Sequence, residues 1–452
     1  KRSFSRHRRS CCVLMVRIVA FVPCKGTSSR VESKNTKLLD SKPLFLHTLE
    51  KLLFECPFID KVVLDSESDD VFEAAEFLVS DDPKLVFLKR DEALATNKTD
   101  GNTLFMNEVE RFDAEIYVQA LCTSPFIHPE TIKKGVESVM SGVYDSACTV
   151  RDDKLYTWTK AGPSYDIQNI PNSVDLPTTT VETMGLYIIT RDAAKLTRRR
   201  IGNKPHMLHV TPEEAVDINY EVDFALANNI ALAHRVAGLS RLRCAKLHLT
   251  SAILSDTLDD MGISGRVVFG LKPQGALSKL FGRACTLKLR PLRESEDLRG
   301  IYGALKSYNY VGFGDVIVVE NPMKGRAYFG DLNAHIAITR GAAGFVTNGF
   351  TRDTVEVKCS NFPVYAAGST CSDVRGVATV ESTNQCISLD GVSCCPGDLI
   401  FSDQEGTLII PRRFGNIVIE EALKRVFSES SIRQDILNGS SVSEIVARHG
   451  SF

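Results

Sequence analysis

The chain has 452 residues, of which 43% are hydrophobic and 24% are charged, and its formal net charge is −2. This is the composition of an ordinary globular protein, and the near-neutral charge gives no support to a nucleic-acid or membrane-surface partner. The length favours two or three domains, and no apolar run approaches the roughly 20 residues that span a bilayer.

The basic start and the cysteines bear on targeting and compartment. Residues 1–14 are basic and resemble the start of a targeting peptide, but Arg17 interrupts the apolar run that follows. We predict a disordered extension there, with organelle targeting as the alternative. The 13 cysteines are scattered without a Cys-x-x-Cys pair, and the adjacent pairs at 11–12 and 394–395 suit neither an ordinary disulfide nor zinc. Reduced thiols in a cytoplasmic protein are therefore expected.

The first predicted element is a buried strand, residues 18–22, which ends in a small, hydroxyl-rich and basic loop. Gly26 lets the backbone come close to a ligand, and the backbone N–H groups of the loop would offset negative charge together with Lys25, Arg30 and Lys34. Three cations and a glycine beside a strand end favour a polyphosphate site over an ordinary surface turn. The spacing matches neither the Walker pattern nor the dinucleotide glycine pattern.

Strands and helices alternate after this loop. Apolar residues three and four positions apart predict a helix over 43–56, and short buried strands are predicted at 61–64 and 85–88 with a helix over 71–79 between them. This order predicts an α/β fold with a doubly wound parallel sheet, in which ligands bind at the carboxyl ends of the strands. Further along, Trp158, the single tryptophan, is expected to pack in a strand.

The loop and the strand ends resemble those of one family. Pro-x-Lys-Gly-x-Ser-x-Arg, then Lys-Asn, then Lys-Pro-Leu is similar to the nucleotide-binding signature of the acylneuraminate cytidylyltransferases, with Lys25 in place of the usual Arg. That family and its Kdo-activating relatives transfer CMP from CTP onto a 3-deoxy-2-keto sugar acid, on a nucleotide-diphospho-sugar-transferase-like fold. The resemblance implies nucleotide contacts from Lys25, Gly26, Ser28, Arg30, Lys34, Asn35, Arg90, Gln119 and Thr123.

One position in this signature departs from the family. Leu121 stands where the family places a Gln, and Gln119 lies two residues earlier on the same side of the strand. We therefore predict that Gln119 substitutes for it.

The reaction that the resemblance implies is in-line attack of an anomeric hydroxyl on the α-phosphorus, which depends on positioning and on charge stabilisation. Lys25, Arg30 and Asp217 are the catalytic candidates.

The substrate and metal contacts of this half are predicted between residues 142 and 224. Glu182 and Gly185 resemble the strand over which the family's sugar acid lies, and a later segment resembles its Asp-Ile-Asp-x-x-x-Asp-Phe metal motif. Asp217 and position 219 project to the same side of an extended chain, so that two oxygens can meet one hard cation. Position 219 is Asn219, a neutral donor. We expect magnesium to bind through Asp217 and the CTP phosphates, but more weakly.

A second domain is predicted over residues 239–452, after a first domain over 15–236. A glycine turn precedes the pair Arg352 and Asp353, and Asp331 opens a predicted helix. An arginine fork can bind a carboxylate through two parallel hydrogen bonds, and the two aspartates can bind a divalent cation directly or through water. Taken alone, a surface ion pair and a helix cap would explain these residues better.

The order of motifs in this half resembles a second family, which groups the regulator of ribonuclease E activity A with 4-hydroxy-4-methyl-2-oxoglutarate aldolase. Gly-Asp-Val, Gly-Asp-Leu, Gly-Phe-Val-x-x-Gly-x-x-Arg-Asp, Pro-Val-Tyr-Ala and Pro-Gly-Asp-Leu-Ile follow one another within roughly residues 242–450. The resemblance implies a second α/β domain. It also implies a pyruvate-type keto acid bound by Arg352 and Gly330, with Asp331 assisting and Asp353 at the metal.

Three functional hypotheses remain open from the sequence. The chain is a CMP-sugar synthetase fused to a metal-dependent pyruvate lyase, or a synthetase whose second domain only regulates or oligomerises, or a silent protein in which Lys25, Leu121 and Asn219 mark lost sites. A 3-deoxy-2-keto sugar acid is itself a pyruvate aldol adduct, so the two halves could act on one metabolite. Mg²⁺ or Mn²⁺ is the expected cofactor, and a homo-oligomer is expected because both families commonly self-associate.

Overall fold

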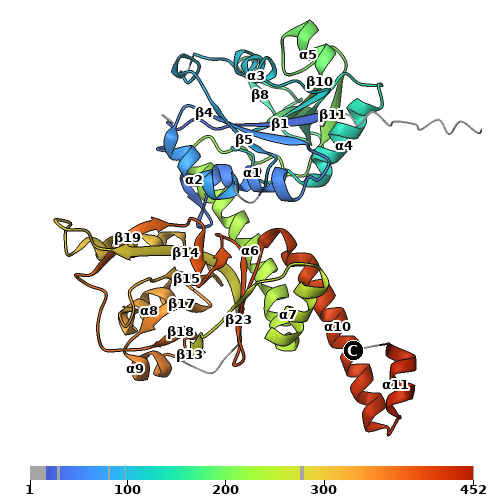
Figure 1. Ribbon diagram of the computed structural model, residues 1–452. Coiled ribbons are helices and arrows are strands. Elements are labelled where there is room, and N and C mark those ends of the chain that lie inside the picture. The colour runs from blue at the N-terminus through green and yellow to red at the C-terminus, as the bar shows by residue number, and fades with distance from the viewer. Residues whose placement is uncertain (1–16, 28–30, 80–81, 97, 275–278, 451–452) are drawn as a thin grey trace, which may run out of the picture. The chain divides into compact units, whose positions relative to one another are not determined.

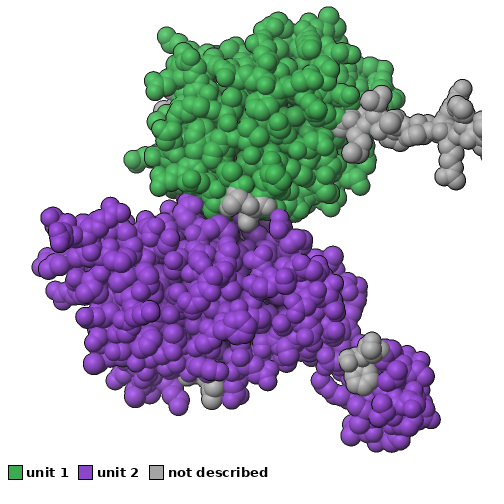
Figure 2. Space-filling view, in the orientation of Figure 1, with its two compact units in different colours: residues 1–37, 43–227 green, residues 38–42, 228–452 purple. Residues whose placement is uncertain are grey.

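The computed structural model of the protein divides into two compact units (Figures 1 and 2). The described residues are 17–27, 31–79, 82–96, 98–274 and 279–450, so the predicted extension at 1–14 lies outside them. Unit 1 comprises residues 1–37 and 43–227, and unit 2 comprises residues 38–42 and 228–452. Helix α6 (Glu221–His248) runs unbroken through 236–239, where the sequence predicts the junction between the two domains.

Unit 1 is built on a seven-stranded sheet in the order β11-β7-β10-β6-β1-β4-β5. Strands β1, β4, β5 and β6 are parallel, so their carboxyl ends share one edge, whereas β10 runs antiparallel to β6 and β7. This confirms the predicted parallel arrangement for the strands nearest the loop. The strands are β1 (Ile18–Pro23), β4 (Lys61–Ser66), β5 (Leu85–Lys89), β6 (Ile116–Ala120), β7 (Ser146–Asp153), β10 (Thr179–Thr190) and β11 (Pro205–His209).

Helices cover both faces of this sheet (Figure 1). Helices α3 and α5 share an apolar core with β1, in which the Phe21 ring stacks on Tyr117 with centroids 6.0 Å apart. The helix α3 begins where the Asp100 carboxylate accepts the N–H groups of Asn102 and Thr103. The helices are α1 (Leu44–Phe54), α2 (Asp69–Val79), α3 (Gly101–Val109), α4 (Pro129–Met140) and α5 (Arg191–Thr197), and α1 and α2 occupy the two predicted helical stretches.

Trp158 does not pack as the sequence predicts. It lies in the two-residue strand β8 (Trp158–Thr159), which pairs only with β9 (Gly162–Pro163), and its side chain is 68% exposed. The Tyr165 ring contacts it edge-on, with centroids 6.5 Å apart. The prediction was wrong because a hairpin this short has no second layer in which a large ring can be buried.

Unit 2 is built on a ten-stranded sheet in which β14, β15, β17 and β18 are parallel. Its strands are β12 (Val267–Val268), β13 (Lys272–Pro273), β14 (Leu280–Pro291), β15 (Val316–Glu320), β16 (Ala327–Phe329), β17 (Gly344–Thr351), β18 (Val364–Ser369), β19 (Ala378–Thr383), β22 (Leu399–Ser402) and β23 (Thr407–Ile410). Both units therefore have the α/β class that the sequence predicts.

The helices of unit 2 are α7 (Ser251–Asp260), α8 (Asp331–Thr339), α9 (Thr354–Cys359), α10 (Gly415–Leu437) and α11 (Val442–His449), together with the longer part of α6. The Thr250 hydroxyl caps α7 by accepting the Ile253 N–H. Helix α10 extends from the body of unit 2, and α11 folds back beside its end (Figure 1). In the part of the chain that the structure describes, every helix is too short or too polar to cross a bilayer.

Unit 2 takes in residues 38–42, which carry the turn between β2 (Leu38–Leu39) and β3 (Lys42–Pro43). Arg235 of α6 lies between two carboxylates, with Nε 2.7 Å from Asp40 Oδ2 and Nη1 2.6 Å from Asp315 Oδ1. Burial alone would lower the Arg235 pKa, but the two carboxylates outweigh burial and raise it. Removing one partner from such a buried group costs about 3–5 kcal/mol, so this cluster contributes to the folding of unit 2.

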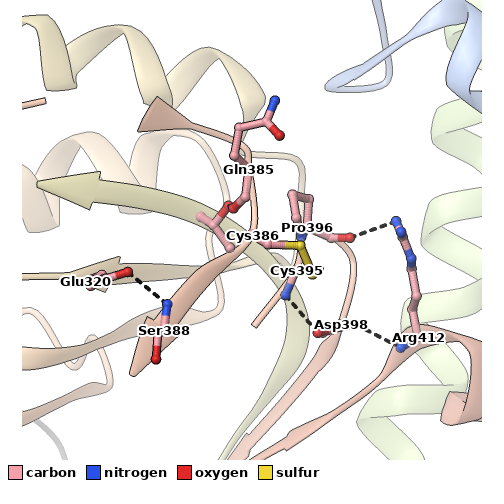
Figure 3. Close-up of a disulfide and its surroundings, with 9 residues drawn as sticks. Glu320, Gln385, Cys386, Ser388, Cys395, Pro396, Asp398 and Arg412 are labelled. Carbon is pink, nitrogen blue, oxygen red and sulfur yellow. Dashed lines mark hydrogen bonds between the residues drawn. A yellow bond between two sulfur atoms is a disulfide. The ribbon is translucent and has the colours of Figure 1, made fainter. Parts of the chain in front are cut away.

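A disulfide joins Cys386 and Cys395, whose Cα atoms are 4.1 Å apart (Figure 3). The two cysteines flank the hairpin of β20 (Ile387–Leu389) and β21 (Val392–Cys394), and they face each other across it. Asp398 supports this corner, since its carboxylate accepts the Cys395 N–H at 2.8 Å and the Arg412 N–H at 2.9 Å. The prediction of reduced thiols was wrong here because spacing along the chain does not reveal which cysteines meet across a hairpin.

Candidate functional sites

The carboxyl edge of the unit 1 sheet brings together three segments that are far apart in the sequence. Lys34 Nζ donates to the Ile218 carbonyl at 2.6 Å, and the Ile218 N–H donates to the Thr123 carbonyl at 2.9 Å. The loop after β1, the turn after β6 and the segment before α6 are therefore tied at one point. Lys34, Thr123 and Asp217, which were predicted from separate motifs, lie on these three segments.

Asp217 and Asn219 lie side by side, as their alternation predicts. Asn219 Nδ2 donates to Asp217 Oδ2 at 2.5 Å, and Asp223 holds this turn by accepting the N–H groups of Asn219 and Tyr220 at 2.9 and 2.8 Å. Among the described residues no group of three or more His, Cys, Asp or Glu side chains could hold a metal ion. Asp217 and the amide oxygen of Asn219 fit a divalent cation only as part of a set completed by ligand oxygens or water.

The loop after β1 is supported from within the unit. Asn35 Nδ2 donates to the Lys25 carbonyl at 2.8 Å, and the Cys122 thiol is 3.4 Å from Asn35 Oδ1. Asn35 is buried at 7% exposure, so its amide acts as a brace of the loop. Ser28 and Arg30, two predicted contacts, lie outside the described residues.

Gly26 is held by the turn that follows β4. Its N–H donates to Glu67 Oε1 at 2.8 Å, and a Cβ at this position would collide with the Cβ of Ser68. The two turns meet because β1 and β4 are parallel neighbours whose carboxyl ends coincide. The sequence predicts that N–H groups of this loop bind phosphate, but the Gly26 N–H is bound to a carboxylate in this structure. Close packing on Ser68, as well as approach to a ligand, explains the glycine.

Arg90 and Gln119 are buried beneath this edge, at 4% and 0% exposure. The Arg90 guanidinium binds the Asp65 carboxylate at 3.0–3.1 Å, and Gln119 Nε2 donates to Glu108 Oε2 at 2.7 Å. Neither side chain is exposed to a ligand in this structure, so direct contact with a nucleotide stays a prediction for both. Sequence reasoning missed Glu108 and the pairing of Asp65 with Arg90. The available signal was a carboxyl group within the otherwise apolar buried face of α3.

Glu182 and Gly185 lie on either side of a bulge in β10. The register with β7 shifts between Glu182 and Tyr187, and Met184 has a φ of 58°. The Tyr187 hydroxyl donates to Glu182 Oε1 at 2.5 Å. A Cβ at Gly185 would lie 2.7 Å from the Ser124 Cβ, so only glycine lets β10 pack this closely on the turn after β6. Glu182, an exposed residue, pairs in register with Val150 of β7 and is the last residue to do so before the bulge.

The predicted residues of unit 2 also meet. The Asp331 N–H, at the start of α8, is 3.3 Å from Asp353 Oδ2, which is 3.5 Å from Arg352 Nε. A Cβ at Gly330 would collide with that same carboxylate oxygen. The sequence missed Asp373, whose Oδ2 lies 2.6 Å from Arg352 Nη1. The Arg352, Asp353 and Asp373 side chains are 35–41% exposed, so a small ligand can reach the cluster.

Elsewhere in unit 1, a hollow of about 520 Å³ is bordered by α4 and β11, and none of the predicted site residues line it. Its lining residues are Thr131, Lys134, Glu137, Ser138, His206, Met207, Leu208 and His209.

Chemically, the two clusters described above differ. The first offers lysines, a carboxylate and a carboxamide at a strand edge, which suits a phosphate-bearing ligand with a cation. The second offers an arginine among carboxylates at a helix start, which suits a small carboxylate with a cation.

Both halves of the chain are similar to known proteins. A family model described as Cytidylyltransferase matches residues 19–201, and one described as Aldolase/RraA matches residues 251–409. The chain is 32% identical over 180 residues to a putative 4-hydroxy-4-methyl-2-oxoglutarate aldolase of Halalkalibacterium halodurans. The aligned residues make up 39% of this chain and 80% of that protein. It is 24% identical over 296 residues to the N-acylneuraminate cytidylyltransferase of Oncorhynchus mykiss. That alignment covers 62% of this chain and 66% of that protein.

A further relative is the protein DlpA of Legionella pneumophila, which is 31% identical over 203 residues. That match covers 44% of this chain but 32% of DlpA, so the chain spans about a third of the length of this relative.

Proposed function

Because this chain joins a domain of the cytidylyltransferase family to a domain of the aldolase/RraA family, we propose that it transfers CMP from CTP to a 3-deoxy-2-keto sugar acid and releases pyrophosphate. The observation that supports the proposal most directly is that Lys34 and Thr123 both hydrogen-bond to Ile218, the residue after Asp217, at the carboxyl edge of the unit 1 sheet. The relative from Oncorhynchus mykiss is named an N-acylneuraminate cytidylyltransferase, which supports a sugar acid as acceptor.

The residues of unit 1 would act mainly by positioning. Lys25 would place positive charge beside the triphosphate, while Lys34, which is 7% exposed, ties the loop to the Ile218 carbonyl. Phosphoryl-type transfer needs little other chemistry from the protein. Asp223 fixes the turn that carries Asp217 and Asn219. A magnesium ion held by these two side chains and by phosphate oxygens would add charge stabilisation at the reacting phosphate.

The test is pyrophosphate release from CTP by the full-length protein with Kdo, Kdn, N-acetylneuraminic acid and legionaminic acid in turn. We expect release with at least one acid and none when the acid is left out. Absence of release with all four acids would favour the hypothesis of a silent protein. Self-association and a cytoplasmic location stay predictions from the sequence.

A second function is favoured by the cluster of Arg352, Asp331 and Asp353 in unit 2. We propose that this cluster binds the carboxylate of a pyruvate-type keto acid, with a divalent cation at the two aspartates, and that unit 2 cleaves or forms a pyruvate adduct. The alternative is a regulatory or oligomerising unit without chemistry. An arginine that is paired with carboxylates and still reachable from solvent supports the first of these.

Gly26→Ala should weaken CTP binding. The new Cβ would collide with Ser68, so the loop after β1 must shift, and overpacking of this kind corresponds to a rise of about tenfold to hundredfold in the KM for CTP. Ser68→Gly removes the colliding atoms, and the double variant Gly26→Ala/Ser68→Gly should recover most of the loss. Steady-state pyrophosphate release measures both effects, and a double variant no better than Gly26→Ala would contradict this explanation.

A further inference from the structure

Glu67, which follows β4, links the loop after β1 to a buried arginine. Its Oε1 accepts the Gly26 N–H at 2.8 Å, and its Oε2 lies 3.7 Å from Arg90 Nη1. That second oxygen is buried and has no hydrogen-bond partner among the described residues, so the Arg90 charge is what compensates it. Arg90 is itself held by Asp65, through its carboxylate at 3.0–3.1 Å and its carbonyl at 2.8 Å.

A third carboxyl group, that of Glu108, lies near Asp65 and Arg90. Glu108 of α3 and Asp65 are both fully buried, and Gln119 Nε2 donates to Glu108 Oε2 at 2.7 Å. The pKa of Glu108 is raised well above its ordinary value, first by burial and then by the negative charge of Asp65. Glu108 therefore holds its proton more readily than an ordinary glutamate, and Asp65 and Glu67 are the two carboxylates that contact Arg90. The arginine is thereby fixed, and it fixes Glu67 in turn.

We propose that Glu67 is a positioning residue for CTP, which holds the Gly26 backbone so that the described start of the loop after β1, with Lys25, keeps the shape in which it meets a triphosphate. The inference rests on the proposed function of unit 1. Glu67 acts through Gly26 and not on the nucleotide, because a carboxylate beside a triphosphate repels it. The side chain is suited to this role since Arg90 restrains it and it is only 13% exposed.

The rival explanation makes the opposite prediction. If the Glu67 carboxylate occupied an N–H that CTP needs, its removal would tighten CTP binding. If it positions the loop, its removal weakens CTP binding. The direction of the change in affinity therefore decides between the two.

The test uses Glu67→Ala, Glu67→Gln and Glu108→Gln in the full-length protein, with the KM for CTP, the KM for the sugar acid and kcat measured by pyrophosphate release. Loss of a hydrogen bond to a charged group predicts a rise of about tenfold to hundredfold in the KM for CTP for Glu67→Ala, with the KM for the sugar acid unchanged. Glu67→Gln keeps an acceptor for the Gly26 N–H and should restore most of the affinity. Glu108→Gln should resemble the wild type, because the raised pKa of Glu108 favours the protonated form, which glutamine mimics.

Calorimetric titration of each variant with CTP alone separates this proposal from the proposed function. If the wild type binds CTP but turns over no sugar acid, the reaction proposed above fails while the affinities still test Glu67. An unchanged or lower Kd for Glu67→Ala overturns the positioning role. If Glu67→Ala does not fold, Glu67→Gln decides, and a Kd more than about tenfold above wild type for that variant overturns the proposal.

Discussion

Asp217→Asn is expected to slow pyrophosphate release from CTP by about 10²- to 10³-fold, the largest effect we predict in unit 1. Asp217 supplies the charged oxygen of the Asp217–Asn219 pair, and an amide is a far weaker ligand for a hard divalent cation. The expected loss lies mainly in kcat, because charge stabilisation at the reacting phosphate matters most in the transition state. Steady-state assays at saturating CTP and sugar acid measure it.

The reciprocal change provides the matched control. Asn219→Asp adds a second carboxylate beside Asp217 and should lower the magnesium concentration that gives half-maximal activity. Calorimetric titration of the CTP complex with Mg²⁺ should show tighter binding for the same variant, independently of turnover. An unchanged magnesium dependence in Asn219→Asp would refute our account of how this turn holds the cation.

Arg352→Ala is expected to abolish pyruvate release by unit 2, with a loss of about 10²- to 10³-fold, and to leave CTP turnover unchanged. The Arg352 guanidinium contacts the Asp353 and Asp373 carboxylates, whereas Arg326 reaches only the Asp373 carbonyl, so without Arg352 a keto-acid carboxylate would meet uncompensated carboxylates. Because these side chains are 35–41% exposed, breaking the surface ion pairs should cost little stability, about 0–1 kcal/mol. A coupled lactate dehydrogenase assay with Mg²⁺ or Mn²⁺ measures the pyruvate.

Arg352→Lys is the matched control for this prediction. Lysine keeps the charge but loses the two-pronged geometry, so its activity should fall between those of the wild type and Arg352→Ala. If the full-length wild type releases no pyruvate from Kdo, Kdn or a sialic acid with either metal, unit 2 has a regulatory or oligomerising role. If Arg352→Ala releases pyruvate at the wild-type rate, Arg352 does not bind the keto acid.

Helices and strands of the fold could be predicted where nearby residues in the sequence determine where they begin or which face they bury. Helix α1 follows from apolar residues at three- and four-residue steps, and the start of α7 follows from Thr250, whose hydroxyl caps it. The loop after β1 could be located because a glycine and several cations follow an apolar strand. The cluster around Arg352 was likewise placed by motif order, since its members lie at the ends of β16 and β17 in one sheet.

What could not be predicted depends on contacts across the sheet. The Glu67 carboxylate reaches Gly26 because β1 and β4 are neighbours, and no pattern within either segment encodes that hydrogen bond. Gln119 was placed on the correct strand, but its burial against Glu108 depends on where α3 packs. The disulfide was missed for the same reason, because the turn between β20 and β21 decides which cysteines face each other.

The grouping of residues 38–42 with unit 2 has a consequence for anyone who dissects the gene. No single cut yields the whole of either unit, since a fragment that starts at residue 239 lacks both Asp40 and Arg235 yet retains Asp315, which is 5% exposed. Such a fragment would keep Asp315 in its interior without its ion-pair partner Arg235 and should be prone to aggregate, whatever its catalytic competence. Shuffling or truncation libraries would therefore score this half as defective for a reason unrelated to its chemistry.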